Sequence, residues 1–531
     1  MSEDVRPGGT YKTLAEQREV LTPAEERFER ARQTIGLFLG PVAFFIMYFL
    51  PLPLPREQHT LAAILAFTII YWLSEAIPIP ATAVLSLALC TLLNVPGVGP
   101  NAEDAPGDIV FGAFADPTIF LFIGAFIIAQ AMITHRLDRR FAFRILSIPG
   151  ISRSTYGVII AFGAIAASIS AFISNTATAA MLLPIGLGMM GALGGLVSDQ
   201  SDTDRDVSRL RFGTALMLMI SYGAGVGGLL TPIGSPPNLI GIAFIEQETG
   251  IRISFFSWVV AAFPICLLMF AFLCVILILL NRPEVRRISG AEEYVNEERR
   301  KLGSLSRGEK NTLIAFVVAV SLWILPGVVA LVFGNESTAY ALVYSRLDEG
   351  TVAIIGAVLL FLLPVNWAER RFTMNWNDAV KIDWGTIILF GSGIALGTLL
   401  SDTGLAETIG TGIAETFGFT SLAAVSAVAA IIAILISETT SNTASATIVV
   451  PIVIPIANAA GLDPVIPALA AVFGASFGFM MPVSTPQNAV VYGSGMIPIT
   501  KMVRSGIVFD IIGLILIVLL IPVMARLVGF V

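Results

Sequence analysis

The feature that most limits how this chain can fold is a succession of long apolar segments. Eleven of them are long enough to cross a lipid bilayer, which takes about 17–25 residues of helix. They lie near 34–54, 60–78, 81–98, 116–134, 212–245, 255–280, 312–334, 350–366, 384–401, 464–497 and 505–529. A soluble core cannot hide them, because only 13% of the 531 residues are charged, against roughly 25% in soluble domains. The sequence therefore predicts an all-α polytopic membrane protein with eleven transmembrane helices.

Two further apolar stretches, 154–186 and 420–457, are interrupted midway by polar residues. We predict that each forms a re-entrant hairpin, which enters the membrane and leaves on the same side. Non-helical backbone at membrane depth is tolerated only where it is buried in protein or faces a water-filled cavity. The two interruptions should therefore lie inside the protein, away from lipid.

The distribution of basic residues predicts the orientation of the chain, because cytoplasmic loops are enriched in Lys and Arg. With a cytoplasmic N-terminus, the internal segments hold all but four of the 31 Lys and Arg residues. The four exceptions are Arg56, Arg252, Arg346 and Arg526. We expect a multi-pass protein of the plasma membrane, the bacterial inner membrane. Polar residues 1–33 should form a cytoplasmic segment, helical in character, before the first span.

A polar connector, 281–311, divides the membrane region into two halves, 34–280 and 312–531. Residues 116–124 of the first half match 383–391 of the second, at an offset of 267 residues. In the predicted topology five crossings separate these copies, and an odd number makes the repeat inverted. Inverted repeats with paired breaks at membrane depth are typical of secondary transporters whose site lies near the midplane.

The same offset relates two polar triplets, one in the middle of each hairpin. They are Ser174-Asn175-Thr176 and Ser441-Asn442-Thr443. Ser, Asn and Thr favour the first position of a helix, and the free amide hydrogens of a helix N-terminus attract anions. One triplet alone would be an ordinary helix cap. Two copies in register, entering from opposite sides, instead favour a binding site for a small molecule with two anionic groups.

Each triplet is accompanied by a second break, at 223–238 and 474–488, rich in Gly and Pro. Such breaks free backbone carbonyls from the helix, and clustered hard oxygens suit a small hard cation. Sodium fits better than a transition metal, since no Cys or His lies near. The candidate ligands of the first ion site are Ser170, Ser174, Asn175 and the Gly234 carbonyl, and those of the second are Ser437, Thr440, Ser441, Asn442 and the Ser484 carbonyl. Some of the glycines would instead serve close helix packing.

Charged residues are scarce near these motifs, and we expect no Arg or Lys beside them. Glu438 is the carboxylate within a motif region, and structural pairing with backbone is favoured for it over proton coupling. Asp116 and Asp383 are expected to be helix caps. The sequence shows no paired carboxylates at membrane depth and no catalytic His or Cys pair, so we predict that the chain is not an enzyme and has no catalytic residues.

These motifs resemble those of the divalent anion/sodium symporter family. The resemblance is carried by residues 174–180, 441–447, 234–238 and 484–488, and it covers the chain from about residue 36 to its end. It implies a homodimer that takes up C4-dicarboxylates (succinate, malate, fumarate) with co-transported sodium, by elevator-type movement of a transport domain past a scaffold. It also implies that Ser235, Thr485 and Pro486 join the two triplets in the substrate pocket.

Two positions depart from the family pattern, Ser437 where Thr is expected and Gln487 where a second Pro is expected. Neither removes an oxygen ligand. The family includes dicarboxylate exchangers and transporters of citrate or sulfate, and these alternatives stay open at this point. The expected partners are a small dicarboxylate, sodium and the lipid bilayer, with no nucleic acid.

Overall fold

The computed structural model describes residues 23–99, 103–200, 210–287, 290–334, 336–417 and 421–531. Within these residues the chain is helical apart from one short β-hairpin, so the predicted all-α class is confirmed. The first half contains α2 (Pro23–Phe49), α3 (Arg56–Ser74), α4 (Ile79–Leu92), α5 (Pro106–Gly112), the 3-10 turn η1 (Ala113–Ala115), α6 (Pro117–Thr134), α7 (Leu137–Leu146), α8 (Thr155–Ser170), α9 (Asn175–Gln200), α10 (Arg211–Gly228), α11 (Pro236–Thr249) and α12 (Phe255–Leu280).

The connector contributes α13 (Ala291–Lys301), and the second half repeats the order of the first. Its elements are α14 (Arg307–Phe333), α15 (Thr338–Arg346), α16 (Glu349–Leu362), the strands β1 (Pro364–Asn366) and β2 (Arg371–Phe372), α17 (Trp376–Ala379), α18 (Trp384–Asp402), α19 (Leu405–Phe417), α20 (Leu422–Thr439), α21 (Asn442–Ala459), α22 (Val465–Ala475), α23 (Pro486–Tyr492) and α24 (Ile499–Leu527). The two strands pair antiparallel.

Eight of the described helices are long and apolar enough to cross a membrane by themselves. Two of the eight, α20 and α21, are the arms of a predicted hairpin. Shorter apolar helices, such as α4 and α16, occupy other predicted spans. The polytopic architecture is thus present, while the number of eleven crossings stays a prediction.

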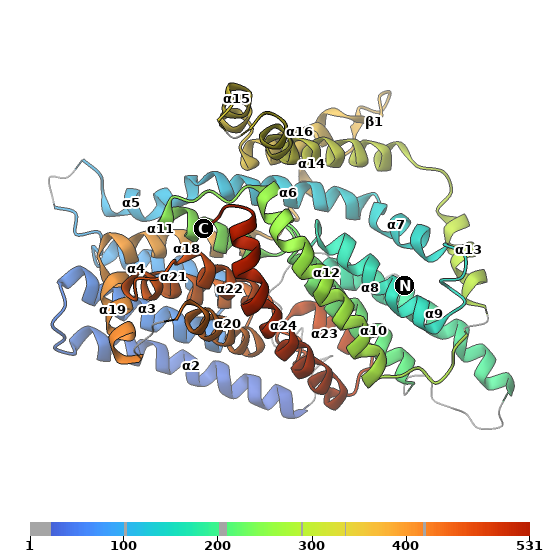
Figure 1. Ribbon diagram of the computed structural model, residues 1–531, viewed down its shortest axis with the longest axis horizontal. Coiled ribbons are helices and arrows are strands. Elements are labelled where there is room, and N and C mark those ends of the chain that lie inside the picture. The colour runs from blue at the N-terminus through green and yellow to red at the C-terminus, as the bar shows by residue number, and fades with distance from the viewer. Residues whose placement is uncertain (1–22, 100–102, 201–209, 288–289, 335, 418–420) are drawn as a thin grey trace.

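Several helices carry large apolar side chains on their outer surface, as a lipid environment requires. Leu331 of α14, Leu279 of α12 and Leu519 of α24 have 75%, 73% and 62% of their surface exposed. In water such surfaces would drive aggregation, whereas lipid tails solvate them. In Figure 1, α2 lies along one edge of the molecule and α14 to α16 along the opposite edge, with the two hairpins between them.

The two spans that carry the predicted Gly- and Pro-rich breaks are each divided into two helices. The first divides into α10 and α11, and the second into α22 and α23. Pro236 and Pro486 begin the later helices, and a residue before proline is held out of the helical region. Ser235 and Thr485 accordingly have extended backbones, with φ of −147° and −145°.

The structure also shows helices where the sequence predicted loops. Helix α7 lies within 136–153, α19 within 401–419, and α13 within the connector. At the N-terminal end, α2 runs from Pro23 into the first span without a break at residue 33, and residues 1–22 lie outside the described part. As predicted, Asp116 and Asp383 cap α6 and α18, each accepting a backbone N–H.

The packing of the two halves is reciprocal. Within each half, the first arm of the hairpin packs on the broken helix, α8 on α10 and α20 on α22. Between halves, α11 packs on α21, which is the second arm of the second hairpin. In the same way, α23 packs on α9, which is the second arm of the first hairpin. The broken helix of each half therefore also contacts the hairpin of the other half, and the residues of both triplets are half-buried apart from the exposed Ser174.

Candidate functional site

The first triplet starts a helix at the tip of the first hairpin. Helix α8 ends at Ser170 and α9 begins at Asn175. The Ser174 hydroxyl oxygen accepts the N–H of Ala177 at 3.3 Å, as an N-cap should. The Ser170 hydroxyl donates to Asn175 Oδ1 at 2.5 Å, so the arm before the turn fixes the amide that follows it.

The second triplet repeats this arrangement. Ser441 caps α21 by accepting the N–H of Ala444 at 3.2 Å. The Ser437 hydroxyl donates to Asn442 Oδ1 at 2.8 Å, and the Ala475 carbonyl oxygen lies 2.9 Å from the same hydroxyl. The last carbonyl belongs to α22, so this contact joins the hairpin to the second break. Ser437 thus keeps the role of Ser170 at the equivalent position.

The paired asparagines Asn238 and Asn488 close the two breaks. Asn238 Nδ2 donates to the carbonyls of Gly228 at 2.7 Å and Thr231 at 2.8 Å. Asn488 Nδ2 donates to those of Gly478 at 2.7 Å and Met481 at 2.9 Å. The side-chain amides therefore satisfy carbonyls that the interrupted helices leave free, which answers why the repeat carries an Asn in each half.

Around Asn175, one of the predicted ligands of the first ion site, the structure places Ser170 and Gly228, and Gly234 lies against the backbone of Gly228 and Ala171. A Cβ on Gly228 would lie 2.6 Å from Asn175 Oδ1, and one on Gly234 would lie 3.0 Å from the Ala171 carbonyl. Only glycine allows this close approach. Ser170 is buried and Ser174 is exposed at the hairpin tip.

The predicted second ion site is similarly compact. A Cβ on Gly478 would lie 3.1 Å from both Asn442 Oδ1 and the Ser484 side chain. Thr440 is buried, and its hydroxyl donates to the Ile436 carbonyl of its own helix at 2.8 Å, so its hydroxyl is already engaged.

The remaining predicted substrate residues lie at the helix starts around these sites. Thr176 and Thr443 are half-buried in the first turns of α9 and α21, and Pro486 is half-buried at the start of α23. Ser235 and Thr485 are buried, and the Thr485 hydroxyl has no hydrogen-bond partner in the described structure. A buried hydroxyl of this kind is costly unless a ligand engages it.

The structure corrects the expectation that no basic residue lies near the motifs. Arg32 of α2 donates to the Thr439 carbonyl at 2.7 Å, two residues before the second triplet begins, and is paired with Glu29 at 2.6 Å. A carbonyl at a helix C-terminus attracts a cation. Arg32 and Thr439 are separated by 407 residues, and no local pattern in the sequence signals their contact.

Glu438 binds backbone as predicted. Its carboxylate accepts the N–H groups of Phe479 at 2.6 Å and Met480 at 2.8 Å, and the hydroxyl of Ser484 at 2.7 Å. The expectation that membrane-depth carboxylates are unpaired is wrong, because Asp510 of α24 lies beside Glu438. Asp510 stands alone within an apolar segment, which was the available sequence signal.

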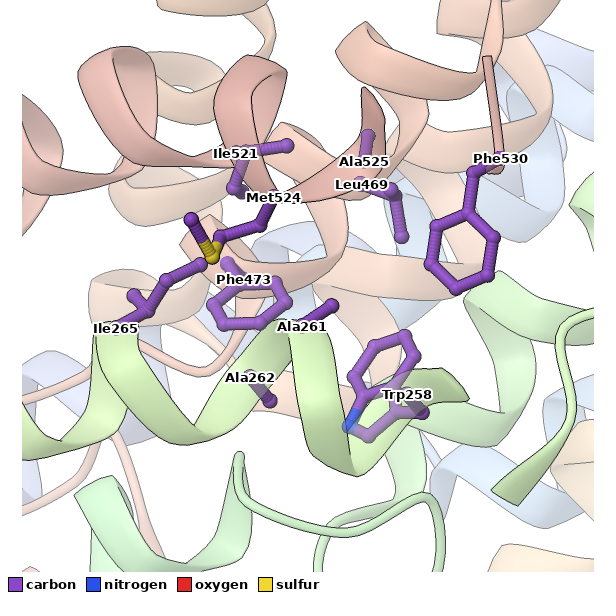
Figure 2. Close-up of a pocket in the computed structure, with 10 residues that line it drawn as sticks. All are labelled: Trp258, Ala261, Ala262, Ile265, Leu469, Phe473, Ile521, Met524, Ala525 and Phe530. Carbon is purple, nitrogen blue, oxygen red and sulfur yellow. The ribbon is translucent and has the colours of Figure 1, made fainter. Parts of the chain in front are cut away.

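A small pocket between α12, α22 and α24 is distinct from these sites. Figure 2 shows that it is lined by apolar side chains, including Trp258, Phe473 and Phe530. Its volume is about 10 Å³, room for about one water molecule. It offers an anion neither charge nor space.

The fold and the paired helix starts define a polytopic membrane transporter, not an enzyme. The family model for the sodium:sulfate symporter transmembrane region matches residues 31–531. The chain belongs to that family, the divalent anion/sodium symporters that its motifs resemble. It is 32% identical to the sodium-dependent dicarboxylate transporter SdcS of Staphylococcus saprophyticus over 501 residues, 94% of this chain and 92% of the relative. It is also 32% identical to SdcS of Staphylococcus aureus (strain bovine RF122 / ET3-1), over 92% of this chain and 91% of the relative.

Two solved structures share the fold at low sequence identity. The YdaH transporter of Alcanivorax borkumensis superposes with a TM-score of 0.52 at 13% identity, over 90% of this chain and 99% of that one. MtrF of Neisseria gonorrhoeae, described as illuminating a class of antimetabolite efflux pumps, superposes with a TM-score of 0.51 at 15% identity. The match covers 86% of this chain and 97% of that one. These likenesses support the architecture alone.

Proposed function

We propose that this protein is a sodium-coupled symporter that brings C4-dicarboxylates such as succinate, malate and fumarate into the cell. The observation that carries the proposal is the pair of capped helix starts at Asn175 and Asn442, each beside a glycine break. Two helix N-termini offer one cradle for each carboxylate of the substrate. The names of the SdcS relatives point to the same cargo and ion.

Sodium supplies the compensation that a dianion needs inside a membrane. Charge at membrane depth is expensive, and helix dipoles offset part of the cost. Cations held by the two sets of Ser, Asn and carbonyl oxygens would offset more. Because Ser170 contacts Asn175 and Ser437 contacts Asn442, occupancy of an ion site would fix the amide that faces the substrate. That link is a physical basis for coupling.

An elevator movement, in a homodimer, is the transport mode that we propose. The contact between Arg32 and the second hairpin supports it. The sequence places Arg32 at the cytoplasmic end of the first span and predicts that the second hairpin enters from outside. A hairpin tip that contacts Arg32 therefore corresponds to a site moved toward the cytoplasmic side, the inward position of an elevator.

Uptake by purified protein in liposomes tests the function. Labelled succinate should enter with an inward sodium gradient and not when potassium replaces sodium. Liposomes that carry the Asn442→Ala variant give the background level of succinate uptake. Entry without sodium, and only into vesicles preloaded with dicarboxylate, would make the protein an exchanger.

A second candidate cargo is sulfate, because the matching family model describes sodium:sulfate symporters. Citrate is a further family cargo. Unlabelled malate, sulfate and citrate should be compared as competitors of succinate in the same vesicles. Competition by malate alone supports the dicarboxylate proposal, and stronger competition by sulfate replaces it.

A further inference from the structure

A pair of buried carboxyl groups lies behind the second break, outside both predicted ion sites. Glu438 is 3% exposed near the end of α20, and Asp510 is 6% exposed in α24. The two groups lie within interaction distance of each other, and the buried Tyr222 hydroxyl of α10 lies near both. Three segments distant in sequence therefore place oxygen atoms at one point.

The two carboxyl groups differ in their surroundings. Glu438 accepts three hydrogen bonds, which leaves about one of its four lone-pair sites free. Both oxygens of Asp510 are buried, and neither accepts a hydrogen bond from an N–H or hydroxyl group of the described structure. The hydrogen-bonding neighbour of Asp510 is the other acid, Glu438. A buried carboxylate with two unsatisfied oxygens is strongly disfavoured unless something positive contacts it.

No basic side chain of the described structure supplies that contact. Helices α12 and α22, which pack on α24, carry no charged residue, and the titratable groups of α12 are two cysteines. The titratable groups that face the pair are the two acids themselves and Tyr222. Arg504, on α24, donates instead to the Leu280 carbonyl at 2.7 Å. Tyr222 donates to the carbonyls of Phe479 and Met502.

We propose that Asp510 and Glu438 form a third sodium site, separate from the two at the hairpin tips. Both Asp510 oxygens and the free Glu438 lone pair are hard ligands of the kind that small hard cations prefer. A proton would satisfy one Asp510 oxygen and leave the other unpartnered, whereas a cation contacts both. The choice of sodium rests on the proposed sodium-coupled function.

The position of this site links it to the second predicted ion site. Glu438 directly follows Ser437, and the Ser484 hydroxyl donates to the Glu438 carboxylate at 2.7 Å and lies 2.9 Å from the Glu438 carbonyl oxygen. A cation between the acids holds Glu438 in place and so holds the second break closed. The position equivalent to Glu438 in the first half, 267 residues earlier, is Ala171. The third site therefore belongs to the second half alone.

Direct counting of bound sodium on purified protein tests the proposal. Radioactive sodium at saturation is measured per protein molecule for the wild type, Asp510→Asn and Asp510→Glu. We expect the count to fall by one in Asp510→Asn and to be restored, with weaker affinity, in Asp510→Glu. Asp402→Asn, which removes an exposed carboxylate at the end of α18, is the control and should bind as the wild type does.

Binding does not depend on transport, so the two proposals fail separately. A wild type that binds the third sodium but carries no dicarboxylate would refute the proposed cargo and keep the site. Equal counts in wild type and Asp510→Asn refute the site. An infrared band of a protonated carboxylic acid in the sodium-loaded wild type, absent in Asp510→Asn, also refutes it, because a proton would then occupy the pair. Gel filtration and dicarboxylate binding show whether Asp510→Asn is folded, and Asp510→Glu decides the question if it is not.

Discussion

At the scale of single residues, the two asparagines that follow the hairpin turns are central to the proposed binding chemistry. Each receives a hydroxyl hydrogen bond from the preceding arm, at 2.5 Å for Asn175 and 2.8 Å for Asn442. The oxygen of each amide is thus held toward the preceding arm, which fixes the orientation of the amide. Preorganised donors lose little entropy on binding.

Replacing either asparagine with alanine should abolish most uptake. Loss of one hydrogen bond to a charged group costs about 1.5–3 kcal/mol, which is roughly a 10- to 100-fold loss of affinity. Labelled succinate uptake by the Asn175→Ala and Asn442→Ala variants, compared with the wild type, measures this loss. The control is Asn458→Ala, an exposed position on α21. Normal uptake by either site variant would show that its triplet is a structural cap.

Replacing Ser170 or Ser437 with alanine should act on sodium instead. Each change removes one hydroxyl ligand, worth about 1 kcal/mol, so the sodium concentration for half-maximal uptake should rise roughly fivefold. The maximal rate at saturating sodium should change less. An unchanged sodium dependence would remove that serine from its ion site.

At the scale of elements, close contact between α8 and α10 positions the first triplet. A Cβ on Gly227 would lie 2.1 Å from the Ala167 carbonyl oxygen, and the backbone cannot yield as a side chain would. A contact between α20 and α22 in the second half is looser. There a Cβ on Gly474 would lie 2.8 Å from the Ala430 carbonyl oxygen.

Gly227→Ala should therefore destabilise the protein more than Gly474→Ala. Overpacking typically costs about 1–3 kcal/mol, and the shorter contact should fall at the upper end. Thermal unfolding in detergent measures the difference. Gly412→Ala in α19, where a Cβ meets nothing within 4 Å, is the control and should be neutral or slightly stabilising. A Gly227→Ala protein as stable as that control would contradict the packing argument.

At the scale of the whole molecule, the connector is docked on the membrane region by ion pairs. Arg139 of α7 contacts Glu298 of α13 at 2.6 Å, and Arg153 contacts Glu292 at 2.6 Å. A cavity of about 390 Å³ lies beside the first pair and is also lined by Met181 of α9. The connector thus reaches the helix that begins at the first triplet.

Docking of the connector should weaken in acid. The pKa of Glu298 is lowered, chiefly by the hydrogen bond from Lys301 and further by the positive charges of Lys301 and Arg139. These effects outweigh partial burial, which raises the pKa. A carboxyl group with a lowered pKa adds stability above its unfolded pKa, about 4.3, and loses it as the pH falls through the folded value. Thermal unfolding of wild type and Glu298→Gln, from neutral to acid pH, should show a shallower acid loss in the variant. The control variant Glu103→Gln should lose stability with falling pH as the wild type does. Equal loss of stability in the wild type and Glu298→Gln would contradict the role of Glu298.

The elevator movement predicts that fixing the second hairpin to α2 stops transport. Arg32→Cys and Thr439→Cys, in a background that lacks Cys90, Cys266 and Cys274, can be bridged by a reversible bifunctional thiol reagent. Uptake should stop when the bridge forms and return when it is cleaved. Each single cysteine variant should be unaffected. Full uptake through an intact bridge would show that this contact persists throughout the cycle.

The sequence by itself determined the features that depend on local chemistry. Apolar length and charge scarcity determined a polytopic helical membrane protein. The repeated Ser-Asn-Thr triplets located two helix starts, Ser and Asn being helix caps wherever a chain turns into a helix. The prolines marked the breaks within 212–245 and 464–497. The exact points of division, at the extended backbones of Ser235 and Thr485, came from the structure.

Only the tertiary structure decided which distant residues meet. Arg32 reaches Thr439 across 407 residues, and Asp510 of α24 reaches Glu438 of α20 across the three helices α21, α22 and α23. Neither contact follows from hydropathy or spacing, because a single charged residue in an apolar helix has no periodicity to reveal its partner. Packing of α2 on the second hairpin brings Arg32 to Thr439, and packing of α24 on α20 brings Asp510 to Glu438. The sequence therefore located the two hairpin tips, and the fold supplied the charges around them.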